Sequence, residues 1–349
     1  MSIYIGMDLH KKTTTFCAMT KEGEVLRECK IPTVPEEVEK FIKSFGKQED
    51  LKIVLEPVSQ SGFYADFLES LDTEVHLAHP KRVKAIAFAK VKTDKIDAKV
   101  LADLLRSNLL PESYHAPRET RLLKEKARSR MSLVEIRTQL KNKVHAILFR
   151  NAIVYPKTTL FTKQGRMWLE KLELSVEYRN HLDSNLKIID SINQEIVSME
   201  KNIKQTVLND EALSLLKTIP GVGDITALTI LSEIGDINRF PDPRHLHSYA
   251  GLVPRVYASG ESSRYGRITK EGSKFLRYIM IETAHHQMLL KRNLVGLKWY
   301  YQRLASRKNN QTAAVATARK LLTIVWKVLQ EKRPYQERLP KTMNIISSI

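Results

Sequence analysis

The stretch from Ile3 to Met19 reads IYIGMDLHKKTTTFCAM and decides the fold of the front of the chain. It contains two apolar runs, Ile3–Leu9 and Thr13–Met19, which predict two strands. The sequence Lys21-Glu-Gly-Glu predicts a turn into a third strand near Val25–Ile31. The chain is therefore expected to begin with three antiparallel strands.

Helices and strands alternate after these three strands. The pattern predicts two strands, at Leu51–Glu56 and Glu74–Ala78, and helices at Glu36–Phe45 and Gly62–Leu71. Two helical stretches close the unit, and the second of them is Asp94–Ser107. This order is typical of a three-layer α/β domain of the ribonuclease-H-like class, in which the first and fourth strands are neighbours. Pro111 and Pro117 bracket the polar stretch that ends it, so we place this domain at residues 1–110.

The rest of the chain is predicted to be mostly helical. Apolar residues recur every three or four positions in two stretches of residues 111–209, from Leu133 to Ile147 and from Ile189 to Ile203. These stretches fit either a long coiled-coil-like assembly region or ordinary amphipathic helices in a bundle. A mostly α-helical domain is expected at residues 210–330, followed by a tail at residues 331–349.

Charge divides the chain in two. The whole chain carries 57 Lys and Arg against 39 Asp and Glu, a formal net charge of +18. Residues 1–117 hold 17 basic and 18 acidic residues, so residues 118–349 carry a net charge of +19. A positive charge of this size predicts a polyanionic partner. Nucleic acid is favoured over an anionic membrane, because no lipid-binding amphipathic terminus is visible.

Cysteine usage and hydropathy indicate the setting. Cys17 and Cys29 are too few for a disulfide framework or a four-thiolate zinc site. No secretory signal is visible, and no apolar run reaches the ~18 residues that span a bilayer. We expect a reduced, cytoplasmic location and no membrane partner.

Four carboxylates stand where a ribonuclease-H-like fold would bring them together. Asp8 lies in the first strand, and Glu56 ends the fourth. Asp94 and Asp97 open the last helix, and their spacing of three puts them on one helical face. Crowded carboxylates need a hard cation, so we expect Mg²⁺, with Mn²⁺ as the alternative, as one or two ions.

Each acid also has an ordinary explanation. Glu56 could be a solvated strand end, and Asp94 could cap its helix. Asp8 is harder to explain in this way, because a carboxylate on an apolar strand is costly without a partner.

Two features of the basic half suggest contacts with phosphate. Residues 216–223 read LKTIPGVG, the pattern of a helix-hairpin-helix, whose Gly221 and Gly223 would let backbone N–H groups approach a phosphate; the alternative is a plain tight turn. The loop-like stretch from Tyr249 to Gly272 is rich in Gly, Ser and Arg and leads into a basic helix, Ser273–Met280. Phosphate contacts, or simple solvation, are expected for its basic residues Arg255, Arg264, Arg267, Lys270 and Arg277.

These motifs together resemble the insertion-sequence transposases of the IS-one-ten type, the bridge-RNA-guided DEDD/serine recombinases. The resemblance covers nearly the whole chain. Its front motifs are GMDLHK (Gly6–Lys11), LEP (Leu55–Pro57), AHPKRVKAIA (Ala78–Ala87) and KTDKIDAKVLADLL (Lys92–Leu105). Its rear motifs are IPGVG, YAGLVPR, the ASG triplet Ala258–Gly260 and GRITKEGSKFLR (Gly266–Arg277). Each is short, but their order and joint presence are specific.

The resemblance implies a RuvC-like N-terminal domain whose acidic tetrad matches Asp8, Glu56, Asp94 and Asp97. It also implies a nucleophilic serine matching Ser259, which composition alone would not single out, with Ser262 and Ser263 as fallbacks. In such enzymes the acids of one subunit and the serine of another form a composite site, and the serine holds a covalent 5′-phosphoserine link to DNA. Further basic residues of the motifs are then expected at nucleic acid: Lys11, Lys81, Arg82, Lys84, Lys92 and Lys274.

The same resemblance implies the partners. They are an element-encoded bridge RNA, double-stranded donor and target DNA, and further copies of the chain in a dimer of dimers, close to the nucleoid of a bacterium or archaeon. Thr269 and Ser273 depart from the serine and asparagine expected there, and His10 stands where serine is frequent, which loosens the rear alignment slightly.

Three other functions are compatible with parts of the sequence. A RuvC-like nuclease or junction resolvase would use metal and water without a covalent intermediate. A structural nucleic-acid-binding protein would need none of the acids. An actin-like ATPase would also open with an acid, Asp8, near a threonine-rich turn, Thr13–Thr15, but would need a second similar domain where this chain is helical.

Overall fold

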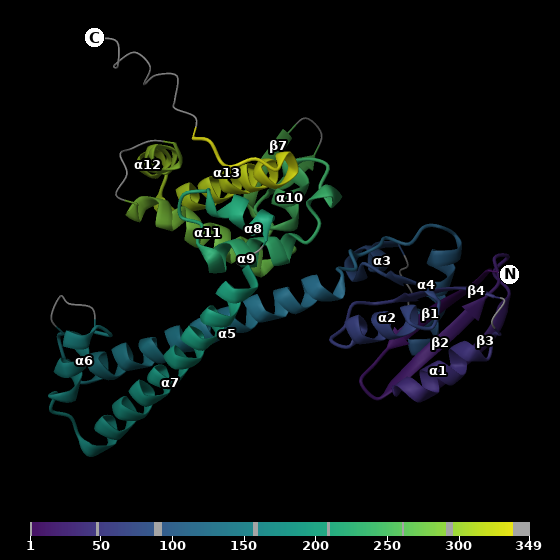
Figure 1. Ribbon diagram of the computed structural model, residues 1–349, viewed down its shortest axis with the longest axis horizontal. Helices are drawn as coiled ribbons and strands as arrows, with labels where there is room; N and C mark the ends of the chain where they lie inside the picture. The colour runs from purple at the N-terminus through teal and green to yellow at the C-terminus, as the bar shows by residue number, and fades with distance from the viewer. Residues whose placement is uncertain are drawn as a thin grey trace, which may run out of the picture. The chain divides into compact units, whose positions relative to one another are not determined.

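The polypeptide divides into two units, Met1–Arg118 and Glu119–Ile349. The computed structural model describes residues 2–46, 49–86, 93–155, 160–207, 210–259, 262–290 and 296–337. Both units are shown in Figure 1. The sequence-based division into four segments stays a prediction.

The first unit is built on a five-stranded mixed sheet with the strand order β3-β2-β1-β4-β5 (Figure 1). Its strands are β1 (Ser2–Leu9), β2 (Thr13–Met19), β3 (Val25–Pro32), β4 (Asp50–Leu55) and β5 (Glu74–Leu77). β2 runs antiparallel to β1 and β3, whereas β4 runs parallel to β1 and β5. The first and fourth strands are neighbours, as predicted from the sequence.

Helices cover both faces of this sheet and make a three-layer sandwich. The helices are α1 (Pro35–Lys43), α2 (Ser61–Glu69), α3 (Pro80–Ile86) and α4 (Asp94–Arg106). Ile5 and Met7 of β1 share one buried cluster with residues of α1 and α2. Val54 of β4 and Cys17 of β2 belong to the clusters that α4 completes on the opposite face. Alternation along each strand therefore decides which side chains face α4.

The second unit is almost wholly helical. Its helices are α5 (Arg118–Arg150), α6 (Lys163–Glu170), α7 (Val176–Val207), α8 (Glu211–Lys217), α9 (Asp224–Ile234), α10 (Pro243–Tyr249), α11 (Lys274–Leu289), α12 (Leu297–Arg307) and α13 (Asn310–Glu331), with a 3₁₀ turn at Ile237–Arg239. The largest buried cluster gathers residues of α8, α9, α10, α11 and α13. No helix among the described residues is long and apolar enough to cross a membrane.

The long helices α5 and α7 run side by side, with α6 at their joined end (Figure 1). Their seam buries Leu140 and Val144 of α5 against Leu182 and Ile189 of α7. Arg130 of α5 also forms an ion pair with Glu200 of α7, with Nη2 and Oε1 2.6 Å apart. The apolar periodicity thus marks real helices, and it corresponds to packing within one chain.

A β-hairpin stands where the sequence analysis expected a loop. β6 (Pro254–Ser259) and β7 (Ser262–Ile268) pair in antiparallel register, with Val256 opposite Tyr265. These two side chains are 58% and 69% exposed. Because neither buries a face, the strands show no apolar–polar alternation, and their Gly, Ser and Arg content resembles that of a loop.

Candidate active site

Asp8 lies near the end of β1, on the face of the sheet that α4 covers. Gly6 is two residues earlier on the same face, and a Cβ there would lie 1.9 Å from the Ala98 carbonyl oxygen and 2.8 Å from the Ala102 amide nitrogen. Ala98 and Ala102 are fully buried. The helix backbone therefore packs directly on the strand backbone, and this contact needs glycine.

The start of α4 is fixed by a side-chain cap. The Thr93 Oγ1 accepts a hydrogen bond from the Ile96 amide at 3.3 Å, so Thr93 is the N-cap and Asp94 is the first helical residue. The capping role that could have explained Asp94 thus belongs to Thr93. Asp94 and Asp97 stand in the first turn, where the helix dipole favours negative charge.

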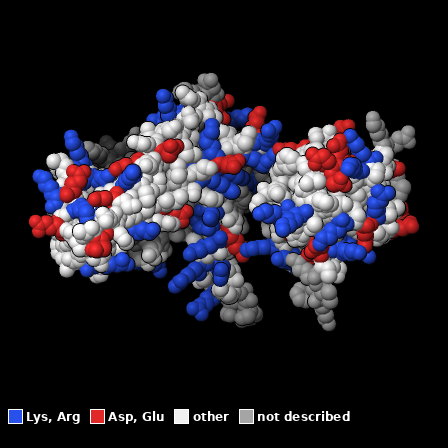
Figure 2. All heavy atoms as spheres, turned by 90° about the horizontal axis from the view of Figure 1, so that it is seen from below, with Lys and Arg blue, Asp and Glu red and all other residues white. Residues whose placement is uncertain are grey.

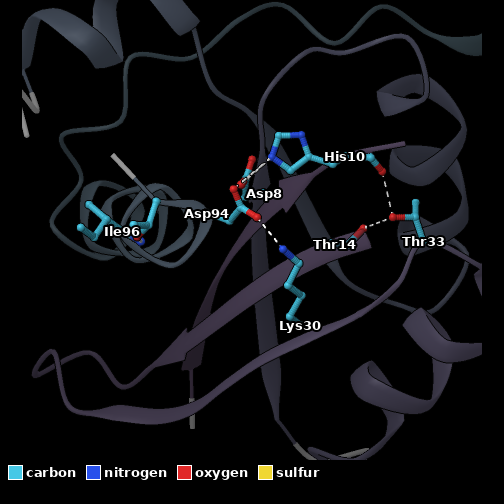
Figure 3. Close-up of polar contacts among 8 residues, drawn as sticks. Asp8, His10, Thr14, Lys30, Thr33, Asp94 and Ile96 are labelled. Atoms are coloured by element: carbon cyan, nitrogen blue, oxygen red, sulfur yellow. Dashed lines mark hydrogen bonds and ion pairs between the residues drawn. The ribbon is translucent and has the colours of Figure 1, made fainter. Parts of the chain in front are cut away.

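Asp8 and Asp94 come together around His10. The His10 Nε2 is 3.1 Å from the Asp8 Oδ2 and 3.6 Å from the Asp94 Oδ1, and the Lys30 Nζ is 2.7 Å from the Asp94 Oδ2 (Figure 3). Ligand atoms of Asp8, His10 and Asp94 all lie within 4.8 Å of one another. This group joins β1, the segment after it and α4.

The pKa values of Asp8 and Asp94 are shifted in opposite directions. Burial raises the pKa of Asp8, whose side chain is 14% exposed, and the nearby charges of Asp97 and Asp94 raise it further against the attraction of His10. The hydrogen bond from Lys30 lowers the pKa of the more exposed Asp94. Asp8, Asp94 and Asp97 thus interact electrostatically, and the charge on Asp8 is the costly one.

Glu56 directly follows the last residue of β4 that is paired with β1. Met7 of β1 is paired with Leu55 of β4, so the next residues of these parallel strands are Asp8 and Glu56. Val54, two residues before Glu56, is buried on the α4 face. Glu56 is half-buried, and among the described residues it lies outside the group of ligand atoms within 4.8 Å.

His10 and Lys30 were not among the predicted site residues. His10 was noted only as a departure from the family pattern, although it follows Asp8 by two positions. Lys30 could have been found from the sheet, since Asp8 pairs with Thr15 and Thr15 pairs with Lys30 in one row across three strands. Pairing register needs the turn geometry, which the sequence pattern left open.

The acidic group fits a divalent metal ion. Asp8 and Asp94 supply carboxylate oxygens, the ligands that Mg²⁺ and Mn²⁺ prefer. Asp97, like Glu56, lies outside the group of ligand atoms within 4.8 Å among the described residues. The raised pKa of Asp8 shows a carboxylate whose charge lacks full compensation in the protein alone. A cation among these oxygens would supply that compensation.

Two protein-family models match this chain. A transposase model of the DEDD type, named for IS110, covers residues 5–151, and the model described as "Transposase IS116/IS110/IS902 family" covers residues 213–302. The chain belongs to the IS110/IS116 family of transposases. The family implies a ribonuclease-H-like fold for the first unit and an enzyme that cleaves and rejoins DNA.

Full-length relatives agree with this assignment. The transposase for insertion sequence element IS1328 of Yersinia enterocolitica is 26% identical and aligns over 93% of this chain and 96% of its own length. The transposase for IS1111A of Coxiella burnetii is 23% identical over 95% and 91% of the two chains. A pilin gene-inverting protein of Moraxella lacunata is 27% identical over 96% and 98%.

The predicted nucleic-acid contacts of the transposase's first unit are exposed. Lys11 follows β1, and Lys81, Arg82 and Lys84 lie on α3 around the buried Val83. Lys92 lies outside the described residues. On the face of the molecule in Figure 2, basic side chains are widely spread among acidic ones.

The IPGVG segment is a turn between two helices. Gly221 has a φ of +82°, and a Cβ there would lie 2.7 Å from Nε2 of the buried Gln287, which donates to the Pro220 carbonyl at 2.5 Å. A Cβ on Gly223 would meet nothing within 4 Å. Gly221 therefore serves the fold, whereas Gly223 lies open for a close approach.

The serine hairpin is surrounded by exposed cations. Ser259 ends β6 and pairs with Ser262 at the start of β7, next to the pair of Ala258 with Ser263. The cations predicted on and after the hairpin are exposed at Arg255, Arg264, Arg267, Lys270 and Lys274. Arg277 is half-buried instead, and its Nη1 donates to the Ala250 carbonyl at 3.0 Å.

A buried acid that was not among the predicted site residues anchors the segment after the hairpin. The side chain of Glu233 in α9 is 0% exposed and accepts hydrogen bonds from Arg128 Nε at 2.6 Å and Ser273 Oγ at 2.8 Å. Ser273 Oγ also caps α11 by accepting from the Leu276 amide. Glu233 thus joins α5, α9 and α11. Its signal in the sequence was an acid near the end of a mostly apolar helix.

Proposed function

We propose that this transposase cuts and rejoins DNA with Ser259 as the attacking group and with one or two divalent metal ions held by the acidic tetrad. The tetrad consists of Asp8, Glu56, Asp94 and Asp97. The observation that carries the proposal is the packing of α4 on Gly6, which brings Asp94 and Asp97 to Asp8, beside the position of Glu56.

The acids would hold Mg²⁺, or Mn²⁺ in its place, which supplies charge stabilisation at the phosphate. Lys30 keeps Asp94 ionised and ready to bind a cation, since its hydrogen bond lowers the pKa of that acid. His10 offsets part of the repulsion between Asp8 and Asp94 when it is protonated. Together these residues keep the carboxylates close before any cation arrives.

The reaction would proceed in two transfers at phosphorus. The Ser259 Oγ forms a bond to a DNA phosphorus, the bond to the 3′ oxygen breaks, and that oxygen ends with the serine proton. A 3′-hydroxyl of another strand then attacks the same phosphorus and releases the serine, which regains a proton. We place the acids and the serine of one reaction on different subunits of a dimer of dimers.

We further propose that an element-encoded bridge RNA pairs with donor and target DNA and so selects them. The support is the net charge of +19 on residues 118–349, together with the exposed cations of the hairpin and of α3. The turn with Gly223 would contact the nucleic-acid backbone as a helix-hairpin-helix. The setting would be the bacterial or archaeal cytoplasm, close to the nucleoid.

Trapping the covalent link tests the mechanism. Labelled DNA carrying the element ends is incubated with the protein, its co-purified RNA and Mg²⁺, and protein–DNA adducts are separated under denaturing conditions. We expect an adduct with the wild type, Ser262→Ala and Ser263→Ala proteins and none with Ser259→Ala. Cleavage by Ser259→Ala at the wild-type rate would instead establish a metal-only nuclease.

The guide is tested separately. Protein purified without nuclease treatment should carry an RNA of uniform size encoded beside its gene. DNA target choice should change when the pairing segment of that RNA is changed. Recombination of unchanged specificity after complete RNA removal would contradict RNA guidance.

A further inference from the structure

A cavity of about 420 Å³ lies in the second unit, and none of its described lining residues belongs to the hairpin that carries Ser259. It is lined by α13, by the first residues of α12 and by the segment from Arg333 to Gln336. That segment is held in place by a hydrogen bond of 2.8 Å from the Tyr335 amide to the Thr218 Oγ1. The volume falls within the range of about 300–1,000 Å³ that small-molecule sites occupy.

The lining combines apolar walls with positive charge. Leu297, Ile324, Val328 and Tyr335 provide apolar and aromatic surface. Lys320, Lys327 and Arg333 provide three cations, against one acid, Glu331, among the described residues of the lining. Glu331 is already engaged with Arg333, with Oε2 and Nη2 2.8 Å apart.

The two lysines project from one face of α13, seven residues or two turns apart. The Lys320 Nζ lies 4.4 Å from the centre of the Tyr300 ring. Burial lowers the pKa of Lys320, although its side chain keeps substantial exposed area. Lys320 also lines the cavity, whose walls displace part of the water around its side chain.

A carboxylate of the chain itself, that of Glu337, lies at the N-terminus of α12. α12 begins after Gly296, which has a φ of +60° and offers no side chain to cap the helix. A Cβ on Gly296 would lie 2.5 Å from the Glu337 Oε1, so this carboxylate stands at the helix N-terminus. Gly296 also lines the cavity. The helix dipole at Gly296 and the two lysines therefore both favour negative charge in this cavity.

We propose that this cavity binds one nucleotide of a single-stranded nucleic acid, with its phosphate at Lys320 and Lys327 and its base against Ile324, Val328 and Tyr335. A basic groove with an aromatic wall is the usual platform for single strands. Glu337 competes with the phosphate and leaves the helix end when the nucleotide binds. This inference deepens the nucleic-acid binding proposed above and rests on it.

Photo-cross-linking identifies the site directly. Full-length Ser259→Ala protein, in EDTA, is mixed with a short single-stranded oligonucleotide carrying 5-iodouracil, irradiated and mapped by mass spectrometry. We expect the cross-link at Tyr335. Cross-links confined to other segments would overturn the proposal. Because neither metal nor the serine is used, a failure of the cutting mechanism would leave this result unchanged.

Matched variants test the charges. Lys320→Ala with Lys327→Ala should weaken binding of the oligonucleotide at least tenfold, whereas Lys308→Ala, an exposed lysine after α12, should change it less than twofold. Glu337→Gln should strengthen binding severalfold, a gain that misfolding cannot produce. The proposal would be contradicted if Lys308→Ala weakened oligonucleotide binding as much as the double variant of Lys320 and Lys327. It would also be contradicted if Glu337→Gln did not strengthen that binding.

Binding of uridine 5′-monophosphate shows whether the cavity takes a free nucleotide or a nucleotide within a strand. Titration calorimetry should show weak binding of this free nucleotide that the oligonucleotide displaces. Tight binding of the monophosphate together with exclusion of the oligonucleotide would overturn the assignment to a strand.

Discussion

The two groups proposed to perform the chemistry are positioned in different ways. In the first unit, Asp8 stands on a strand of the sheet, and the packing of α4 on Gly6 brings Asp94 and Asp97 toward it. The serine of the second unit stands on a hairpin with exposed side chains, beyond which Ser273 is tied to the buried Glu233. The acids are thus brought together by packing in the core of the first unit. The hairpin with Ser259 is instead followed by a polar anchor, the hydrogen bond between Ser273 and Glu233.

The largest expected effect is on cleavage by the first unit. Asp8→Asn or Asp97→Asn should reduce strand cleavage by about a thousandfold, because each removes a proposed metal ligand. Asp103→Asn is the matched control, since this carboxylate on α4 is exposed and paired with Arg106. It should stay within about twofold of the wild-type rate, measured with labelled DNA. If Asp103→Asn lost as much cleavage activity as the other two variants, the effect would not be specific to the proposed site.

The next effect is on the stability of the first unit. Gly6→Ala should lower the free energy of unfolding by about 3 kcal/mol or more, because its Cβ collides with the backbone of α4. Gly223→Ala, where a Cβ meets nothing within 4 Å, should cost no more than about 1 kcal/mol. Calorimetry of both variants checks this, and a wild-type melting curve for Gly6→Ala would show that α4 packs elsewhere.

A smaller effect is expected from the anchor of the second unit. Glu233→Gln should cost about 2 kcal/mol, because Arg128 and Ser273 lose a charged acceptor that is fully buried. Glu200→Gln, whose ion pair with Arg130 is partly exposed, should cost less than about 1 kcal/mol. Tryptophan fluorescence during urea unfolding reports on this unit, since Trp168, Trp299 and Trp326 all belong to it.

The smallest expected effect is a gain in stability from Asp8→Asn, whereas Gly6→Ala and Glu233→Gln should lower stability. Because the folded-state pKa of Asp8 is raised above its unfolded value, its ionised form destabilises the first unit at pH values above the folded pKa. Asp8→Asn should therefore raise the melting temperature at pH 7 in EDTA, and the gain should vanish as the pH falls toward 3.8. A loss of stability at pH 7 would show that His10 more than offsets the burial of Asp8.

Much of the first unit could be predicted from the sequence. Apolar runs and the spacing of Asp94 and Asp97 depend on local periodicity, which is why the strands and the helix that carries both acids were predicted. The adjacency of the first and fourth strands was expected from the fold class, and the structure confirms it. The close packing at Gly6 was not predicted, because it depends on which helix crosses the strand. Lys30 was missed for a related reason, since its place beside Asp94 follows from the register of three strands.

The second unit was harder to predict. The hairpin at Ser259 has exposed side chains on both strands, so no hydrophobic pattern marked it. Glu233 lies among apolar residues, where a lone acid can equally be a surface residue until its partners on α5 and α11 are known. The hairpin at Ser259 and the burial of Glu233 could not be predicted, because neither is marked by a local sequence pattern.

Binding of Mn²⁺ tests the central claim most directly, because it reports on the acids without requiring DNA, RNA or the serine. Electron paramagnetic resonance of the free ion should show one or two Mn²⁺ bound per chain in the wild type and in Asp103→Asn, and a loss of that binding in Asp8→Asn. Equal Mn²⁺ binding by Asp8→Asn and the wild type would contradict the assignment of the acidic group as the metal site.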